Sequence, residues 1–161
     1  MTRPTPESPY PYTRSAAAIL ANLSNPVVKR LGKQLLKKRS RGTGNFVGYN
    51  FDDVLRMKVA KELLHVGVNV ASIHSLFAAI EKDWPRLRQP RTRVVGACLV
   101  LFIGQLGPNS PTGRAYLTTT QEAVDWLKSK QTVVVIDINA LIEDLEQRTG
   151  QPYTTAEQDA R

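Results

Sequence analysis

Residues 42–73 have the sequence GTGNFVGYNFDDVLRMKVAKELLHVGVNVASI, and this stretch decides the predicted fold. From residue 41 to residue 49, three glycines are interleaved with apolar residues, which predicts a β-hairpin. Asn50, followed three residues later by Asp53, predicts an approximate capping box at the start of a long helix. Gly67 is placed to end that helix, because a glycine is the usual residue just beyond a helical C-terminus.

A second helix is expected directly after Gly67. Asn69 can cap it, and four apolar residues then recur at the spacing of one helical face. These residues are Ile73, Leu76, Phe77 and Ile80. The quoted stretch therefore predicts a hairpin followed by a pair of capped helices.

Two shorter helices are expected upstream of the hairpin. The first contains the segment AAAIL with Ser15 as its N-cap, and the turn Asn22-Leu23-Ser24 ends it. Ser24 can cap the second helix, with Pro26 in the first turn, where a missing N–H costs nothing. In the second helix the apolar residues are Val27, Val28, Leu31, Leu35 and Leu36, and the basic residues are Lys29, Arg30 and Lys33. These two groups fall on different sides, although Gly32 weakens the helix by about 1 kcal/mol relative to alanine.

Beyond the helix pair the pattern becomes mixed. Two prolines and four arginines between Asp83 and Arg93 predict a linker. The segments expected after it are a strand at 94–104, a loop at 106–113, a short strand at 115–118, a helix from Thr120 to Leu127, a strand at 132–136, a helix at 139–148 and a polar tail from Gln151.

The charge is unevenly distributed along the 161 residues. Residues 1–50 contain nine Lys or Arg and one acid, residues 51–99 eight and five, and residues 100–161 five and eight. The resulting net charges are +8, +3 and −3. A basic end joined to an acidic end indicates a half that binds a polyanion and a half with another task.

The order helix, turn, basic helix, glycine-rich hairpin and capped helix pair resembles a MerR-type winged-helix domain. LSNPVVKRL at 23–31 resembles that family's turn and the start of its recognition helix. Residues 42–73 resemble its wing and its third and fourth helices, so the resemblance covers about 13–81. The sequence departs from the family at Arg30-Leu31-Gly32, where aromatic residues are usual, and in its second half, where a long dimerising helix is usual.

The resemblance implies an N-terminal winged helix-turn-helix, mostly α with a β-hairpin wing. Together with the small α/β domain that the residue pattern predicts for the second half, the expected fold class is α+β. The expected parts are a flexible arm at 1–12, the winged helix-turn-helix at 13–82, a linker at 83–93, an α/β domain for oligomerisation or partner binding at 94–150, and a tail at 151–161.

This resemblance also implies a DNA-binding site. Side chains on the first turns of a recognition helix reach base edges in the major groove, and Asn25, Lys29 and Arg30 occupy those turns. Basic residues further along position the protein on phosphates instead. The other predicted site residues are Ser24 at the cap, Lys33, Lys37 and Lys38 on phosphates, Arg39, Arg41, Thr43 and Asn45 in the wing, and Tyr49 at the wing's exit, where packing in the core is as strongly expected.

No pattern indicates catalysis, a cofactor or a metal. Cys98 is the single cysteine and forms no recognisable ligand set with His65 or His74. Asp52 and Asp53 favour the dipole at a helix start, and Asp137 is expected to cap the helix that follows it. The longest apolar run, 97–103, is far shorter than the roughly 20 residues of a membrane span, and we expect a cytoplasmic protein.

The expected function is sequence-specific binding of double-stranded DNA to regulate transcription, as a homodimer held together through residues 93–150. A recombination accessory protein with a similar domain is one alternative. An antitoxin or adaptor that docks a partner protein through residues 94–150 is another, and an enzyme on the small α/β domain is a third, less favoured class.

Overall fold

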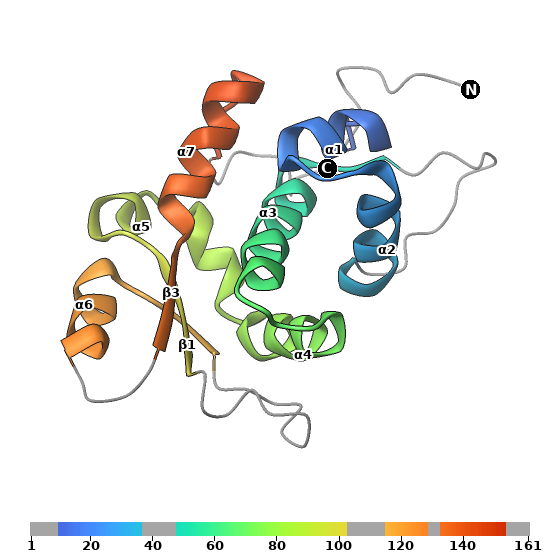
Figure 1. Cartoon of the computed structure of the whole chain (residues 1–161). Coiled ribbons are helices and arrows are strands. Elements are labelled where there is room, and N and C mark those ends of the chain that lie inside the picture. Colours follow the sequence, from blue (N-terminus) through green and yellow to red (C-terminus); the bar gives the residue numbers. More distant parts are fainter. Residues whose placement is uncertain (1–9, 37–47, 103–114, 129–132, 154–161) are drawn as a thin grey trace. The chain divides into compact units, whose positions relative to one another are not determined.

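The computed structural model describes residues 10–36, 48–102, 115–128 and 133–153 (Figure 1). Helices and a three-stranded antiparallel sheet make the chain α+β, as the sequence predicts. It divides into two compact units, Met1–Lys61 and Glu62–Arg161, which are called unit 1 and unit 2 below. No helix in the described ranges is both long enough and apolar enough to span a bilayer.

Unit 1 contains α1 (Arg14–Ala21), α2 (Asn25–Leu35) and most of α3 (Phe51–His65). The N-cap of α1 is Thr13, whose hydroxyl accepts a hydrogen bond from the N–H of Ala16 at 3.1 Å. The prediction that Ser15 caps this helix is therefore wrong. Both residues have capping chemistry, but only Thr13 has the extended backbone that a cap requires, with φ −71° and ψ 168°.

An antiparallel β-bridge joins Tyr12 to Tyr49, so the segment before α1 lies beside the segment before α3. The N–H of each tyrosine donates to the carbonyl of the other at 2.9 Å. Tyr12 was expected at the end of a flexible arm, and this pairing gives it a fixed place. Residues 41–47 of the predicted hairpin lie outside the described residues.

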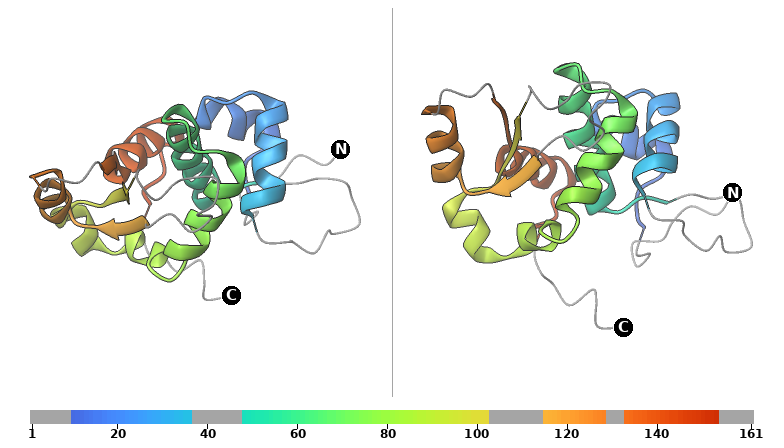
Figure 2. Two further views of the ribbon diagram at one scale, coloured as in Figure 1. Left: turned by 60° about the horizontal axis from the view of Figure 1, so that its bottom comes forward. Right: turned by 90° about the horizontal axis from the view of Figure 1, so that it is seen from below.

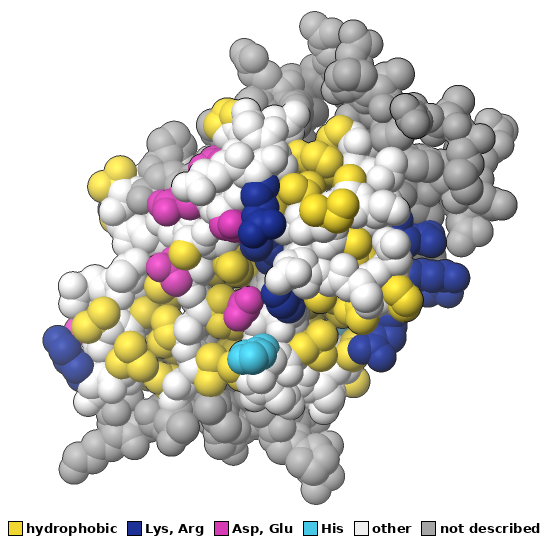
Figure 3. All heavy atoms as spheres, turned by 45° about the horizontal axis from the view of Figure 1, so that its top comes forward, with side chains coloured by type: hydrophobic (Ala, Val, Ile, Leu, Met, Phe, Trp, Pro, Cys, Tyr) yellow, Lys and Arg dark blue, Asp and Glu magenta, His cyan; other side chains and the backbone are white. Residues whose placement is uncertain are grey.

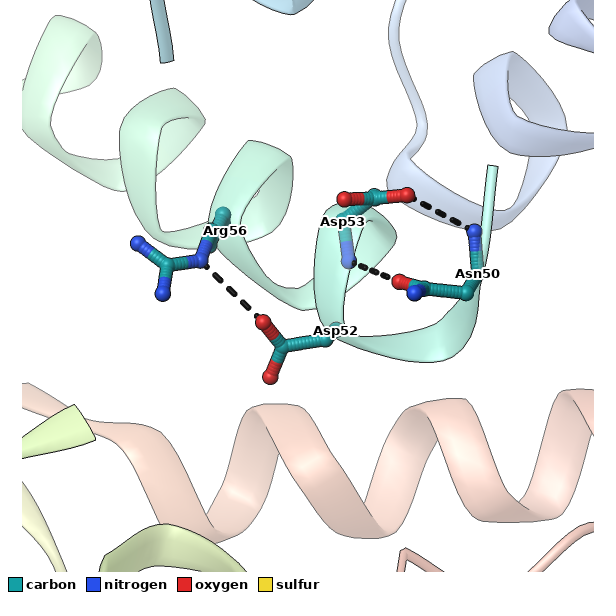
Figure 4. A network of polar contacts seen from close by, with 4 residues as sticks. All are labelled: Asn50, Asp52, Asp53 and Arg56. Carbon is teal, nitrogen blue, oxygen red and sulfur yellow. Dashed lines mark hydrogen bonds and ion pairs between the residues drawn. The ribbon is translucent and has the colours of Figure 1, made fainter. Parts of the chain in front are cut away.

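The capping box predicted at the start of α3 is confirmed (Figure 4). The N–H of Asn50 donates to a carboxylate oxygen of Asp53 at 2.8 Å, and the N–H of Asp53 donates to the side-chain oxygen of Asn50 at 2.9 Å. One turn on, Arg56 Nε lies 3.2 Å from the carboxylate of Asp52. The two adjacent acids thus point to different partners, which agrees with a helix-start role.

Unit 2 begins with the end of α3, which stops as predicted at Gly67, with φ +88°. The N–H of Val68 reaches the carbonyl of Leu63 at 3.0 Å, and that of Gly67 reaches Leu64 at 3.1 Å, the two bonds of a Schellman motif. Asn69 then caps α4 (Val70–Ile80) through the N–H of Ser72. The four apolar residues predicted on one face of α4 are all buried.

The predicted linker at 83–93 is wrong. The segment folds into a 3₁₀-helix, η1 (Trp84–Arg88), followed by α5 (Pro90–Val95). Trp84 and Leu87, three residues apart, share one side of η1 and are both 2% exposed, and the Trp84 ring lies 5.5 Å from that of Phe77. The prolines lie in the first turns of the two helices, where they start a helix rather than break it.

The sheet of unit 2 has the order β2-β1-β3, with β1 (Cys98–Phe102) antiparallel to both β2 (Ala115–Thr118) and β3 (Val133–Asp137). The first strand was predicted from residue 94, but α5 occupies 94–95 and Gly96 separates it from β1 at φ +78°. The predicted strands at 115–118 and 132–136 are confirmed to within one residue.

Two helices complete unit 2. α6 (Thr120–Lys128) lies on one side of the sheet (Figure 2), where Ala123 packs with Cys98 and Val100. Its cap is Thr119, because the N–H of Glu122 donates to the Thr119 hydroxyl at 3.2 Å. Asp137 caps α7 (Ile138–Thr149) through the N–H of Ala140 at 3.1 Å, as predicted.

The chain after α7 is not simply frayed. The N–H of Tyr153 donates to a carboxylate oxygen of Glu146 at 2.6 Å, and the ring is 5% exposed. The Arg88 guanidinium lies over that ring, 5.6 Å from its centre. The start of the predicted polar tail is therefore packed against unit 2.

Candidate nucleic-acid interface

A three-residue turn, Asn22–Ser24, joins α1 to α2, and the two helices cross rather than run side by side (Figure 1). Asn22 adopts the left-handed conformation, with φ 52° and ψ 53°. Its N–H bonds to the carbonyl of Ile19 at 3.1 Å, and that of Leu23 bonds to Ala18 at 2.9 Å. A left-handed residue just beyond a helical C-terminus allows the chain to turn sharply into the next helix.

The first turn of α2 is open at its surface. Ser24 occupies the N-cap position with an extended backbone, its side chain makes no capping hydrogen bond, and the residue is exposed. The first turn holds no acidic residue, so the partial positive charge of the helix N-terminus has no carboxylate beside it there. Such an N-terminus favours a bound anion.

Along α2 the buried and exposed residues fall on opposite faces. Val28 and Leu31 are 0% exposed and hold the helix to the core of unit 1. Asn25, Lys29 and Lys33 are exposed at intervals of four residues, with Arg30 exposed beside them. From Asn25 to Lys33 this face extends about 12 Å along the helix axis, because each residue adds about 1.5 Å.

Tyr49 supports α2 from the core side. The ring is 2% exposed, and a Cβ on Gly32 would lie 3.4 Å from the tyrosine oxygen, 3.5 Å from ring atom Cε1 and 3.8 Å from Met57 Cε. The glycine therefore lies where the tyrosine ring comes close to the helix. Tyr49 has too little exposed surface here to touch a partner directly.

The electrostatic setting of α2 is strongly positive. Residues 8–51 contain no Asp or Glu, so the cations of α2 have no acid on their own helix or on α1. Unit 1 has twelve Lys or Arg and three acids, a net charge of +9, while unit 2 has ten and eleven, a net charge of −1. Figure 3 shows Lys and Arg side chains gathered along its right-hand edge, where α2 lies.

The predicted site residues thus divide into three groups. Ser24, Asn25, Lys29, Arg30 and Lys33 lie together on the exposed side of α2. Tyr49 is in the core. The remaining ones lie outside the described residues: Lys37, Lys38, Arg39, Arg41, Thr43 and Asn45. The sequence did not reveal the pairing of Tyr12 with Tyr49, because no local pattern relates two segments separated by two helices.

The two histidines and the cysteine lie on elements other than α2. Within the described ranges, no three His, Cys, Asp or Glu residues come together as metal ligands, and His65 and His74 are exposed. Burial raises the pKa of the Cys98 thiol, and the negative charge of Asp137 raises this pKa further. The contact between the thiol and the Thr120 hydroxyl, at 3.9 Å, acts in the opposite direction and lowers the pKa. A thiol in that state is a poor nucleophile.

The chain matches no protein-family model and no curated protein.

Proposed function

We propose that this protein binds double-stranded DNA through α2 and acts as a sequence-specific transcription regulator with a winged helix-turn-helix of the MerR type. The observation that carries the proposal is the exposed face of α2, where Asn25, Lys29, Arg30 and Lys33 lie on a helix joined to α1 by a three-residue turn. On this proposal the protein acts by binding rather than by catalysis.

The side chains on α2 suit the chemistry of a major groove. Arginine and lysine donate to the O6 and N7 acceptors of guanine, and asparagine can pair with adenine. Lys33, further from the N-terminus, is suited to a phosphate, which positions the helix without reading sequence. An α-helix, about 10–12 Å across with its side chains, also fits a major groove about 12 Å wide.

The core side of α2 supports the same proposal. Val28, Leu31 and the Tyr49 ring fix the direction in which the basic residues point, and fixed side chains read base edges better than mobile ones. Tyr49 is then a positioning residue for the recognition helix rather than a DNA contact.

A pair of charge-reversal variants tests the proposal. Selection from a random pool of duplexes of about 25 base pairs first provides the preferred sequence for the full chain, since each half-site reader covers several base pairs. Lys29→Glu with Lys33→Glu should then weaken binding to that duplex more than about 100-fold, because α2 would repel phosphates.

The matched control reverses two exposed cations of unit 2, Lys82→Glu with Arg91→Glu. This change lowers the net charge by the same amount but leaves α2 intact, so affinity should stay within about threefold of the parent chain. Equal losses in the two double variants would mean that only net charge matters, and the assignment to α2 would be wrong. If the selection enriches no sequence, the proposal of sequence-specific binding is wrong.

A further inference from the structure

β3 forms one edge of the sheet in unit 2, and no strand of the described chain pairs with its outer side. It packs against β1 and α6. The opposite edge strand, β2, lies against α4. Of the two edge strands, β2 contacts α4, while the outer side of β3 pairs with no strand of the described residues and can accept one.

The composition of β3 gives this edge no protection. The strand begins with four consecutive β-branched residues, Val133, Val134, Val135 and Ile136. None of them is charged, is a proline or belongs to a bulge. Natural proteins usually block an edge strand with one of these features. The first charge, Asp137, comes at the end of the strand and is engaged in capping α7.

Apolar side chains beside this edge also remain exposed to solvent. Val133 and Val135 share the sheet face of Val100 and are only partly buried, because α6 contributes the small Ala123 to that face. The exposed fractions on α6 are 38% for Val124, 38% for Trp126 and 56% for Leu127. Hydrophobic side chains gather over this part of unit 2 at the lower left of Figure 3.

Charge decides which occupant fits. Two copies of unit 1, each with a net charge of +9, repel one another, whereas unit 2 carries −1 and approaches its own copy without that cost. Antiparallel pairing of the valine run with itself opposes no like charges. A second copy would also supply a second α2, which reading two half-sites requires, and this step rests on the proposed function.

We propose that β3 pairs antiparallel with β3 of a second copy of this chain. The two three-stranded sheets then form one continuous six-stranded sheet, and the dimer has two-fold symmetry and two recognition helices. In this dimer the β3 strands of the two copies form hydrogen bonds with each other, so neither β3 remains at an edge.

Sedimentation of the full chain, without DNA, tests the pairing. We expect a dimer for the parent protein and for Val94→Lys, a matched control at a valine on α5 that is 87% exposed. Val133→Lys should weaken dimerisation at least about tenfold, because a lysine on an edge strand opposes the addition of another strand. A parent chain that sediments as a monomer, or a folded Val133→Lys chain that remains as dimeric as the control, overturns the proposal.

Cysteine substitutions provide a second measurement if Val133→Lys fails to fold. The native Cys98 is 3% exposed, so it gives little background crosslinking. Val133→Cys, Val134→Cys and Val135→Cys are oxidised one at a time, with Val94→Cys as control. We expect one of the three β3 positions, the one nearest the two-fold axis, to form a disulfide-linked dimer far faster than the control. Equal rates at all four positions overturn the proposal.

The two proposals fail in different ways. A dimer that binds no duplex DNA retains the β3 pairing and removes the proposed function. A monomer that still selects a short duplex retains the proposed function and removes the pairing, leaving an extended peptide of another protein as the occupant of the β3 edge.

Discussion

The two units of this protein use the same local devices and present opposite surfaces. Each has a helix started by a reciprocal capping box, Asn50–Asp53 in unit 1 and Thr119–Glu122 in unit 2. Unit 1 nevertheless carries a net charge of +9, and unit 2 carries −1 with four large apolar residues on β2 and α6 more than a third exposed. These four are Tyr116, Val124, Trp126 and Leu127.

The comparison teaches that local structure and surface chemistry are set separately. Caps and turns fix where each helix begins, while the residues left exposed decide what each unit can bind. On the proposals above, unit 1 binds a polyanion and unit 2 binds an apolar, uncharged partner. The predictions below test this division.

Salt should separate the two units most strongly. If unit 1 binds duplex DNA through about 6–10 phosphates per dimer, affinity should fall by about 10³–10⁵ between about 50 and 200 mM salt. Dimerisation through unit 2 should change little over the same range, because the β3 edge is uncharged from Val133 to Ile136. Fluorescence anisotropy and sedimentation in the same buffers measure both. A flat DNA-binding curve would contradict the polyanion role of unit 1.

Two glycines should respond in opposite directions to alanine. At Gly96 in unit 2, φ is +78° and an added Cβ would lie 1.8 Å from Thr120 Oγ1, so Gly96→Ala should destabilise unit 2 by about 2–4 kcal/mol. At Gly32 in unit 1, an added Cβ meets Tyr49 and Met57 at ordinary contact distances. Gly32→Ala should therefore stabilise α2 by about 0.5–1 kcal/mol.

Urea unfolding of both glycine variants measures these changes. Gly96→Ala combined with Thr120→Ala should recover the part of the loss that comes from the clash and leave the part that comes from φ. A destabilised Gly32→Ala chain would show that the Tyr49 ring cannot accept a methyl group, and that α2 is packed more tightly than these distances indicate.

The matched arginines should sharpen the assignment of α2. Arg30→Ala should lose about 1–3 kcal/mol on the selected duplex, about 5- to 150-fold in affinity, and relax the preference at one or two base pairs. Arg91→Ala, an exposed arginine of unit 2, should leave the sequence preference unchanged. Anisotropy titrations against single-base variants of the duplex measure this. A similar change of preference in both variants would mean that α2 does not read bases.

The smallest expected effect is a pH dependence in unit 2. A hydrogen bond from the Thr118 hydroxyl and another from the Thr119 N–H lower the pKa of Glu122 below its ordinary value of 4.5. A lowered folded pKa stabilises the protein above the unfolded value, and this contribution is lost as the pH falls through the folded pKa. Thermal melts should thus show less acid destabilisation for Glu122→Gln than for the parent chain. Identical pH profiles would mean that this carboxylate is not held in the folded state.

The caps of α3, α4 and α7 and the basic helix were predictable because their signals are local. Asn50, Asn69 and Asp137 were each identified as caps from the two or three residues that follow, and the exposed face of α2 follows from helical spacing alone. The linker predicted at 83–93 was wrong because this segment is held by distant contacts rather than by local signals. Pro85 and Pro90 were interpreted as breakers, while the burial of Trp84 and Leu87 depends on packing with residues such as Phe77.

The sequence by itself determined the charge division, the starts of α3, α4 and α7 and the apolar run of β3, since each depends on neighbouring residues. Only the tertiary structure decided that Tyr49 is buried against Gly32, that Tyr12 pairs with Tyr49, and that β3 rather than β1 lies at an edge. These features arise from contacts between segments distant along the chain. Their free energy depends on which surfaces meet, and no short window of sequence contains that information.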